Sequence, residues 1–468
     1  MKEFDNMLET DYLIVGAGAS GMAFADILLT ETDANIIIID KFHKPGGHWN
    51  FAYPFVKLHQ PSSFYGVSSS KLGYDTIDGF GFNRGLISLA TGDTIRAYYD
   101  DIMQRRFLPS GHVQYFPLSE YQGHSKFKSL LSGKNFKVKV NIKTVDATHM
   151  KTKIPATHVP NFSIDPEVTF ISINELPNLK TTPSGFVIIG GGKTGVDACL
   201  WLLENGVDPK KITWIVNRDS WFTNRINTQP SPKYLTNFLY DLAAQFESLA
   251  QAQSISDLFH RLEKTGVLLR IDQQISPKMF HGATVSELEL EQLRRIKNII
   301  RKGHVKQIEK DKIILEQAEL TTNPDSVFVD CSAAALCHRE MKPIFSGNTI
   351  TIQSVRTAQL VFSAALIAHV ECQYSDENFK NEICREIPMP DHDTDWIKNN
   401  AISMMNQYKW SKNPELSEWL YNNRLDGFSH LVANISPDDI EKNEILDRIS
   451  QSIKPAMAKI QEFAAQLK

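Results

Sequence analysis

Two glycine-rich loops constrain the fold of this chain more than any other feature of its sequence. The first, Gly16–Gly21, lies between an apolar run at Tyr12–Val15 and a helical pattern at Met22–Leu29. A second apolar run, Ile36–Ile39, follows and ends at Asp40. This order predicts a strand, a tight turn, a helix and a second strand parallel to the first.

The first loop has the pattern G-x-G-x-x-G, which lets backbone N–H groups approach a pyrophosphate at the start of a helix. Asp40, at the end of the following strand, can accept hydrogen bonds from ribose hydroxyls. A glycine turn can also serve only to pack a helix on a sheet, but the complete unit favours a dinucleotide site. The candidate contacts are Gly16, Gly18, Ala19, Ser20, Gly21, Asp40 and Lys41.

The second glycine loop, Gly190–Gly195, repeats this arrangement. It lies between an apolar run at Phe186–Ile189 and a predicted helix at Val196–Glu204, and a predicted strand at Ile212–Val216 follows. Its Gly-Lys-Thr sequence resembles the end of a P-loop, but that motif needs glycine where this chain has Val187. The loop therefore predicts a second dinucleotide site, with candidate contacts Gly190, Gly192, Lys193, Thr194 and Gly195.

The strand after this second helix ends in a cation where an NAD-specific fold has an acid. Asn217 and Arg218 stand there, and an arginine at this place accommodates the 2′-phosphate of NADP, which an acid would repel. The alternative is a solvated charge at a strand end. Arg225 could share the phosphate, and Lys193 could meet the pyrophosphate or face water. We expect NADPH rather than NADH, with Asn217 and Arg218 among its contacts.

The composition favours small-molecule ligands. With 50 Lys and Arg against 54 Asp and Glu, the net charge is −4, so no excess of positive charge favours nucleic acid or an anionic membrane. The five cysteines form neither a C-x-x-C pair nor a zinc spacing, so we expect no metal site and no disulfides. The N-terminus has no signal-peptide pattern and no apolar run is long enough to span a bilayer. We expect a cytoplasmic protein.

A short segment after the first unit indicates a known family. Gly46-Gly47-His48-Trp49 is followed by Tyr53-Pro54 and by residues 58–62. Together with the glycine loops, this segment resembles the class B flavin-dependent monooxygenases, over roughly residues 10–370. These enzymes share G-G-x-W after the FAD-binding unit, and then a segment that crosses the flavin ring. The resemblance implies FAD at the first loop, with Gly47, His48 and Trp49 among its contacts, and NADPH at the second.

The same resemblance implies a reaction. NADPH would reduce the flavin, O2 would form a flavin C4a-hydroperoxide, and one oxygen atom would pass to a small organic substrate. Counted from Tyr53, His59 stands where Baeyer–Villiger members have an aspartate, and Gln60 is the nearest counterpart of an asparagine that faces the flavin in N- and S-oxygenating members. Both could instead be ordinary polar residues of a loop. We expect His59 and Gln60 to donate hydrogen bonds beside the flavin.

The chain departs from this family before the second loop. The linker fingerprint F-x-G-x-x-x-H, followed by an aromatic residue, is absent from residues 158–179. An NADPH-dependent flavin reductase or dehydrogenase without oxygen insertion is therefore an alternative, and a non-catalytic nucleotide-binding protein is a third, against which two intact loops argue. The disulfide-reductase branch fits worse, because no cysteine precedes Cys199. No pattern names the substrate or the oligomeric state.

The predicted fold class is α/β, with two Rossmann-like dinucleotide-binding domains and a helical C-terminal region. The resemblance to the flavin monooxygenases further implies that the NADP domain is inserted in the FAD domain. A proline-punctuated stretch, 153–185, marks the first boundary. A hairpin and a buried strand at Val327–Val329 are expected within 303–330. The expected domains are 1–152 for the first part of the FAD domain, 153–325 for the NADP domain with a helical insertion at about 232–300, 326–372 for a return segment that completes the FAD domain, and 373–468 for the C-terminal region.

Overall fold

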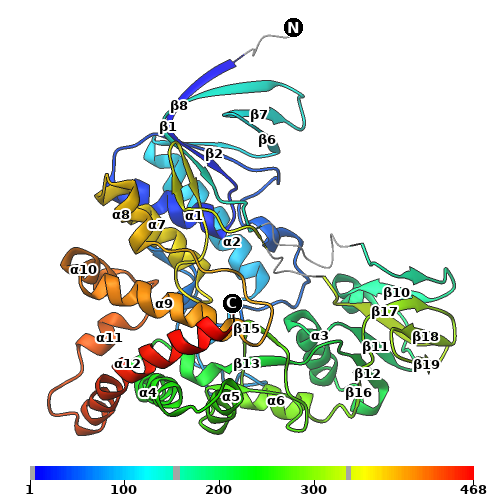
Figure 1. Ribbon diagram of the computed structural model, residues 1–468. Coiled ribbons are helices and arrows are strands. Elements are labelled where there is room, and N and C mark those ends of the chain that lie inside the picture. Colours follow the sequence, from blue (N-terminus) through cyan, green and yellow to red (C-terminus); the bar gives the residue numbers. More distant parts are fainter. Residues whose placement is uncertain (1–5, 151–158, 334–338, 468) are drawn as a thin grey trace.

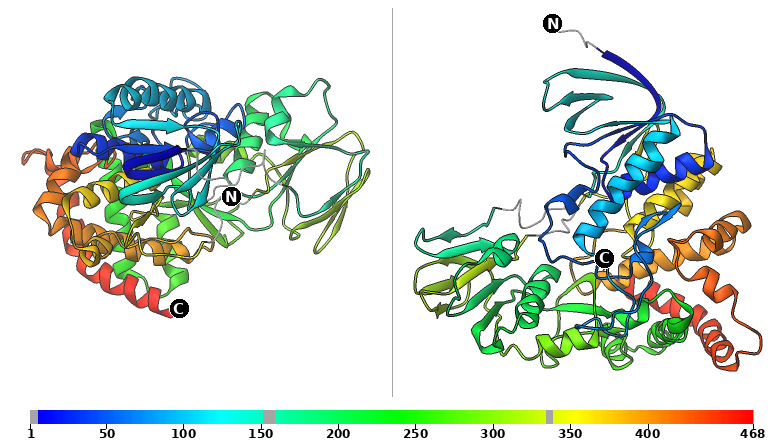
Figure 2. Two further views of the ribbon diagram at one scale, coloured as in Figure 1. Left: turned by 90° about the horizontal axis from the view of Figure 1, so that it is seen from above. Right: turned by 180° about the vertical axis from the view of Figure 1, so that it is seen from behind.

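The computed structural model describes residues 6–150, 159–333 and 339–467. Figure 1 shows a first sheet at the top of the molecule, a second sheet at the right and a body of helices below. Figure 2 shows that the second sheet and the C-terminal helices lie on opposite sides of the molecule. The architecture is mixed α/β with two parallel Rossmann-like sheets and C-terminal helices, as the sequence predicts.

The first sheet contains the N-terminal strand–helix–strand unit. Its order is β21-β22-β8-β1-β2-β5, and all neighbours from β22 to β5 are parallel. The four residues of β2 are isoleucines that are all buried, as expected for a parallel strand covered on both faces. The strands are β1 (Asn6–Val15), β2 (Ile36–Ile39), β5 (Val113–Phe116), β8 (Asn135–Asp146), β21 (Phe345–Ser346) and β22 (Thr349–Thr351), with the hairpin β6 (Ser119–Gly123) and β7 (Lys126–Ser129) attached to β8.

Two buried helices cover this sheet. Helix α1 (Ala19–Glu31) begins in the first glycine loop and packs against α7 (Leu360–Gln373). Residues 361–370 of α7 are all buried, which explains why this stretch is apolar on every side. The connection between β2 and β5 holds the short strands β3 (Gly66–Val67) and β4 (Ser70–Lys71), helix α2 (Gly92–Ile102), and the 3-10 turns η1 (Gly47–Phe51) and η2 (Ser62–Phe64).

The second sheet repeats the plan of the first. Its order is β10-β20-β11-β12-β16, and every pair is parallel. Helix α3 (Lys193–Glu204) begins in the second glycine loop, and Gly206 ends it with a φ of +80°. The strands are β10 (Thr169–Ser172), β11 (Phe186–Ile189), β12 (Ile212–Ile215), β16 (Asn298–Ile300) and β20 (Val327–Asp330); beside them lie β9 (Ser163–Ile164), β17 (Val305–Ile308), β18 (Lys312–Leu315) and β19 (Glu319–Thr321).

The expected boundary at residue 326 is wrong. The predicted strand at 327–329 forms, but as β20 it pairs with β10 and β11 in the middle of the second sheet. The chain rejoins the first sheet only at β21 and β22, where β22 pairs with β8. The second sheet is therefore inserted within the first, as predicted. Strand β20 belongs to the second sheet, because all four of its residues, three of them apolar, are buried there between β10 and β11.

The expectation of a mostly helical stretch at 232–300 is correct only in part. Helices α4 (Leu235–Gln251), α5 (Ile255–Lys264) and α6 (Glu287–Leu293) form. Between α5 and α6 the chain is extended, and it builds a small sheet in the order β14-β13-β15 from β13 (Ser220–Asn224), β14 (Leu268–Leu269) and β15 (Met279–Val285). The insertion thus begins at β13, before residue 232.

The C-terminal region is helical, as predicted. Helix α12 packs along α4 of the insertion and against α9 (Figure 1). The insertion and the C-terminal region therefore share two clusters of apolar core residues. The helices are α8 (Glu377–Ile383), α9 (Asp395–Ser411), α10 (Pro414–Asn422), α11 (Ser429–Ala433) and α12 (Ile440–Gln466). Within the described ranges, no helix combines the length and the apolar character that a membrane span requires.

The shared core gives a prediction about stability. Ile460 is 0% exposed and Ile453, on the same helix, is 40% exposed. Replacing Ile460 with Ala should lower the free energy of unfolding by about 2–5 kcal/mol, because a buried cavity is left behind. The same change at Ile453 should cost less than about 1 kcal/mol. Denaturant titrations of both variants test this, and similar losses at the two positions would contradict the described packing.

Candidate functional site

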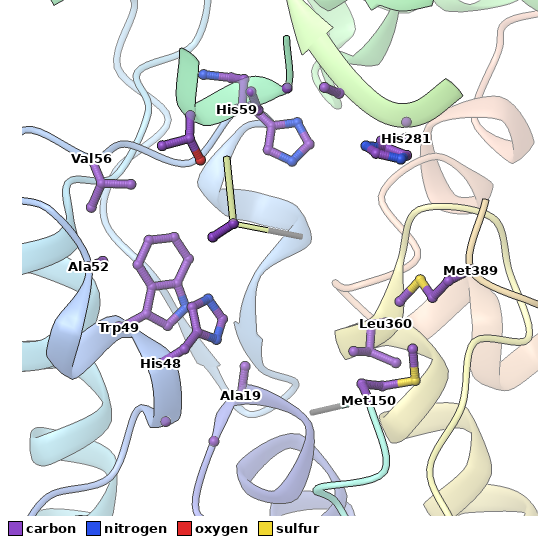
Figure 3. Close-up of a pocket in the computed structure, with 18 of the residues that line it drawn as sticks. Ala19, His48, Trp49, Ala52, Val56, His59, Met150, His281, Leu360 and Met389 are labelled. Carbon is purple, nitrogen blue, oxygen red and sulfur yellow. The ribbon is translucent and has the colours of Figure 1, made fainter. Parts of the chain in front are cut away.

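A single cavity of about 1600 Å³ joins the two glycine loops. It lies at the carboxyl ends of β1, β2, β11 and β12, where ligands of open parallel sheets bind. The turn η1, the segment 56–61 and the return segment around the start of α7 complete the wall. Figure 3 shows His48 and Trp49 of η1, Val56 and His59 of the segment 56–61, and Leu360 of α7 around this cavity.

The glycines of the first loop have different physical roles. Gly16 has a φ of +104°, which favours glycine, and a Cβ at Gly21 would overlap the carbonyl oxygen of Gly16. Gly18 has extended backbone angles, and a Cβ there would make only ordinary contact with Gly47. Gly16 and Gly21 are therefore needed for the fold, whereas Gly18 leaves space beside the cavity. No side chain caps α1, so its first N–H groups, at Ala19 and Ser20, are free for an anion.

Asp40 is buried at the end of β2 and its carboxylate holds the loop. Its two oxygens accept hydrogen bonds from the N–H groups of Ala17 (2.6 Å) and Phe42 (2.7 Å). Burial raises the pKa of Asp40, although these hydrogen bonds act in the opposite direction. Each carboxylate oxygen has a further lone pair for a ribose hydroxyl. Lys41 is exposed at the rim of the cavity.

The aromatic segment forms one wall of the cavity. Gly47 has a φ of +59° and begins η1, which carries His48 and Trp49. Trp49 is buried, and its Nε1–H donates to the Tyr65 hydroxyl at 2.7 Å. Burial lowers the pKa of His48 to about 4, so this imidazole is neutral at pH 7. The structure therefore brings the predicted Gly47, His48 and Trp49 beside the first glycine loop (Figure 3).

His59 and Gln60 also line the cavity. The Thr284 N–H donates to Nδ1 of His59 at 3.2 Å, so the ring proton is on Nε2. Burial, with smaller contributions from Lys193 and Arg225, lowers the pKa of His59 to about 3, which keeps the ring neutral. The amide of Gln60 has no hydrogen-bond partner among the described residues. Both side chains therefore have a donor available.

Arg225 cannot share a cofactor phosphate, contrary to the expectation from the sequence. It is 0% exposed and forms an ion pair with Glu289 at 2.7 Å. Its Nε donates to the His59 carbonyl oxygen at 3.0 Å, and the two terminal nitrogens donate to Asn83 and to the Thr284 carbonyl oxygen. Arg225 therefore braces the His59 segment against β15.

The second glycine loop has the same construction as the first. Gly190 has a φ of +130°, and a Cβ at Gly195 would overlap the Gly190 carbonyl oxygen, whereas a Cβ at Gly192 meets nothing within 4 Å. Thr194 lines the cavity at the start of α3, which has no side-chain cap. Lys193 also lines the cavity, where its ammonium group is paired with Asp197.

Asp197 connects α3 to the segment that carries Tyr53. Its carboxylate also accepts a hydrogen bond from the hydroxyl of Tyr53, which follows η1 in the first domain. Burial, Asp197 and the hydrogen bond raise the pKa of Tyr53 well above its ordinary value. Tyr53 therefore stays protonated and ties the first domain to α3.

Arg218 lies at the end of β12 as predicted, but it is not free. Its terminal nitrogens form a two-point ion pair with Asp391, at 2.6 and 3.1 Å. The same carboxylate lies 3.3 Å from Nε2 of His281. Nearby, the Asn217 amide lies 3.2 Å from Nε2 of His304. All four groups, with Asp391, line the cavity.

Sequence reasoning missed Asp391 and His281. Asp391 follows α8 in a Pro-Met-Pro-Asp-His segment, and His281 lies in the strand β15 that was expected to be helical. Neither residue belongs to a sequence motif. They lie beside Arg218 only because the segment between α8 and α9, which carries Asp391, packs on β15. Cys331 also lines the cavity, and burial raises its pKa well above the ordinary value, so it is a protonated thiol.

A family model described as an NAD(P)-binding Rossmann-like domain matches residues 14–54. FAD and NAD(P) share an ADP half, so this match concerns the part that both ligands have in common. Proteins named as uncharacterized in Mycobacterium tuberculosis and Mycobacterium bovis are 46% identical to this chain over 442 residues, covering 94% of it and 81% of each relative. The chain belongs to their family.

Several solved structures resemble this family member. A closed cyclohexanone monooxygenase is 11% identical, with a TM-score of 0.49 over 97% of this chain and 98% of its own. A bacillithiol disulfide reductase from Bacillus cereus is 14% identical, with a TM-score of 0.45 over 78% and 99%. A flavin-containing monooxygenase from Stenotrophomonas maltophilia is 13% identical, with a TM-score of 0.42 over 78% and 98%.

The different surroundings of two arginines give a prediction. Arg225→Ala should lower the free energy of unfolding by about 3–5 kcal/mol, because Glu289 loses its buried partner. Arg218→Ala should cost less than about 1 kcal/mol, because the Arg218 and Asp391 side chains are 34% and 47% exposed. Denaturant titration of the two variants measures both values. An equal loss in both would show that Arg225 is not the buried brace described above.

Proposed function

We propose that this protein is an NADPH-dependent FAD oxidoreductase, and specifically a single-component flavin monooxygenase that oxygenates a small organic molecule. The observation that carries the proposal is the cavity, because it is continuous between two dinucleotide loops. A flavin and a nicotinamide bound at these loops would share this cavity. A lone nucleotide-binding scaffold has no need of this arrangement.

The residues of the first loop fit FAD. The uncapped start of α1 and the open side of Gly18 suit a pyrophosphate, and Asp40 suits a ribose. The wall from Gly47 to Gln60 would then lie along the flavin. The start of α7 also opens on the cavity without a side-chain cap, which favours the negative charge of a reduced flavin. The FAD contacts proposed are Gly16, Gly18, Ala19, Ser20, Asp40, Lys41, Gly47, His48 and Trp49, and Gly21 fixes the turn behind them.

The residues of the second loop fit NADPH. The start of α3 and the open side of Gly192 suit its pyrophosphate, and Arg218 is the cation for the 2′-phosphate. The contacts proposed are Gly190, Gly192, Lys193, Thr194, Asn217 and Arg218, and Gly195 fixes the turn behind them. NADPH and FAD together would supply two-electron reduction and reactivity toward O2.

The protein's own side chains would control this chemistry. Neutral His59 and unpartnered Gln60 can donate hydrogen bonds to an oxygen atom in the cavity. Since both the ring tautomer and the backbone of His59 are fixed by Thr284 and Arg225, the donor is held before any ligand binds. The apolar side chains Val56, Met150, Leu360 and Met389 line the same space and would exclude water (Figure 3).

Three measurements test the proposal in sequence. The purified protein should contain FAD, and anaerobic mixing should show faster flavin reduction by NADPH than by NADH. Turnover under ¹⁸O2 with panels of amines, sulfides and ketones should place the label in a product. Label found only in hydrogen peroxide or water would favour the reductase, which the missing linker fingerprint also favours. Absence of both flavin and NADPH-dependent turnover would refute any redox function.

Gly18 and Gly192, where a Cβ would fit without a clash, give a matched pair of variants. Gly18→Ala should fold, because its Cβ makes only ordinary contact, but should weaken FAD binding by about tenfold or more, since the pyrophosphate loses its close approach. Gly192→Ala should retain FAD and weaken NADPH instead. Flavin absorbance and NADPH titration separate the two effects. Full flavin content in Gly18→Ala would place the FAD elsewhere.

The proposed role of Gln60 can be tested by measuring how far NADPH oxidation is uncoupled from product formation. Gln60→Leu should leave FAD content and flavin reduction by NADPH within about twofold, while product formed per NADPH falls by about tenfold or more and hydrogen peroxide replaces it. Gln114→Leu, at an exposed position of β5 away from the cavity, is the control. If Gln60→Leu slows flavin reduction as strongly as product formation, Gln60 does not act at the oxygen step.

A further inference from the structure

At the proposed 2′-phosphate position, the charge of Arg218 is balanced by that of Asp391. Arg218 is on the second domain, whereas Asp391 is on the segment between α8 and α9. The two-point contact uses one donor from each terminal nitrogen of Arg218. A phosphate dianion at Arg218 would therefore meet a carboxylate already bound there, and like charges at this distance repel.

A second partner for this carboxylate is already in place. The Asp391 oxygen that receives the shorter Arg218 contact lies 3.3 Å from Nε2 of His281. The Asp391 backbone is fixed on β15 by a hydrogen bond from the Phe280 N–H at 3.2 Å, and its own N–H donates to Asp395 at 2.9 Å. The side chain can thus change partners by a rotation, with no movement of the backbone.

We propose that Asp391 is a specificity-determining residue of the nicotinamide site, which holds Arg218 in the free protein and passes to His281 when a 2′-phosphate binds. This inference rests on the proposed binding of NADPH at the second loop. Asp391 then lowers the affinity for ligands with a 2′-phosphate and leaves ligands with a 2′-hydroxyl unaffected.

This change of partner by Asp391 also couples binding of the phosphate to uptake of a proton by His281. The charged groups around His281 are Asp391, Arg218 and Asp395, with His392 beside Asp391. In the free protein burial lowers the pKa of His281, although Asp391 acts in the opposite direction. Once Arg218 is engaged by a phosphate, Asp391 interacts with His281 alone and raises that pKa. At a pH between the pKa of His281 in the free protein and its higher pKa in the complex, binding of the phosphate takes up a proton on His281. The affinity gained from this protonation is lost as the pH rises through the pKa of the complex.

The test compares 2′,5′-ADP with 5′-AMP, by calorimetry on the full-length protein with its flavin. Asp391→Asn should bind 2′,5′-ADP about tenfold more tightly, because the repelling charge is gone, and 5′-AMP within about twofold of wild type. Arg218→Ala should remove the preference for 2′,5′-ADP. Asp393→Asn is the matched control, because it removes the same charge from the same segment and lies outside the cavity.

An unchanged or weaker affinity of Asp391→Asn for 2′,5′-ADP would overturn the proposal, since Asp391 would then only orient Arg218. Binding of neither ligand by wild type would refute the nicotinamide site itself, and the inference with it. Proton uptake is measured in buffers of different ionisation enthalpy. The 2′-phosphate itself contributes some proton uptake, and His281→Gln should remove the remainder. Equal proton uptake in wild type and His281→Gln would show that Asp391 does not pass to His281.

Discussion

Each half of the cavity depends on one close approach between two pieces of backbone. At α1 the Cα of Gly21 lies against the carbonyl oxygen of Gly16, and at α3 Gly195 lies against Gly190 in the same way. Any side chain at Gly21 or Gly195 would push the helix off the strand before it. This contact sets the uncapped start of each helix at the carboxyl edge of its sheet. Both helix starts line the same cavity.

The parts of the fold that depend on neighbouring residues could be predicted from the sequence. Strand, glycine turn and helix follow one another within about thirty residues, so periodicity and turn chemistry specify them. The position of β20 could not be predicted in this way. Its three apolar residues, Val327–Val329, suit any interior parallel strand, and only pairing with β10 and β11 decides which sheet it joins. The strand β15 was missed for a related reason, because its partner β13 lies far from it in the chain.

The same distinction applies to the site. Gly16–Gly21 and Gly190–Gly195 carry their signal in their own spacing, and the structure brings both to the cavity. Arg218 and Arg225 look alike in the sequence, but one is partly exposed and the other fully buried. Their partners, Asp391 and Glu289, come from distant segments. No local pattern reports which arginine meets a carboxylate, because that depends on the tertiary packing of β15 and the C-terminal segment.

The insertion of one sheet within the other has a consequence for synthesis of the chain on the ribosome. Residues 159–333 include every strand of the second sheet, so this sheet can close as soon as β20 has emerged. The first sheet cannot, because β22 and the helix α7, which buries α1, follow only at residues 349–373. The largely apolar surface of helix α1 therefore stays exposed to solvent while the second domain folds. Chaperone binding to nascent chains of this protein should concentrate on that helix.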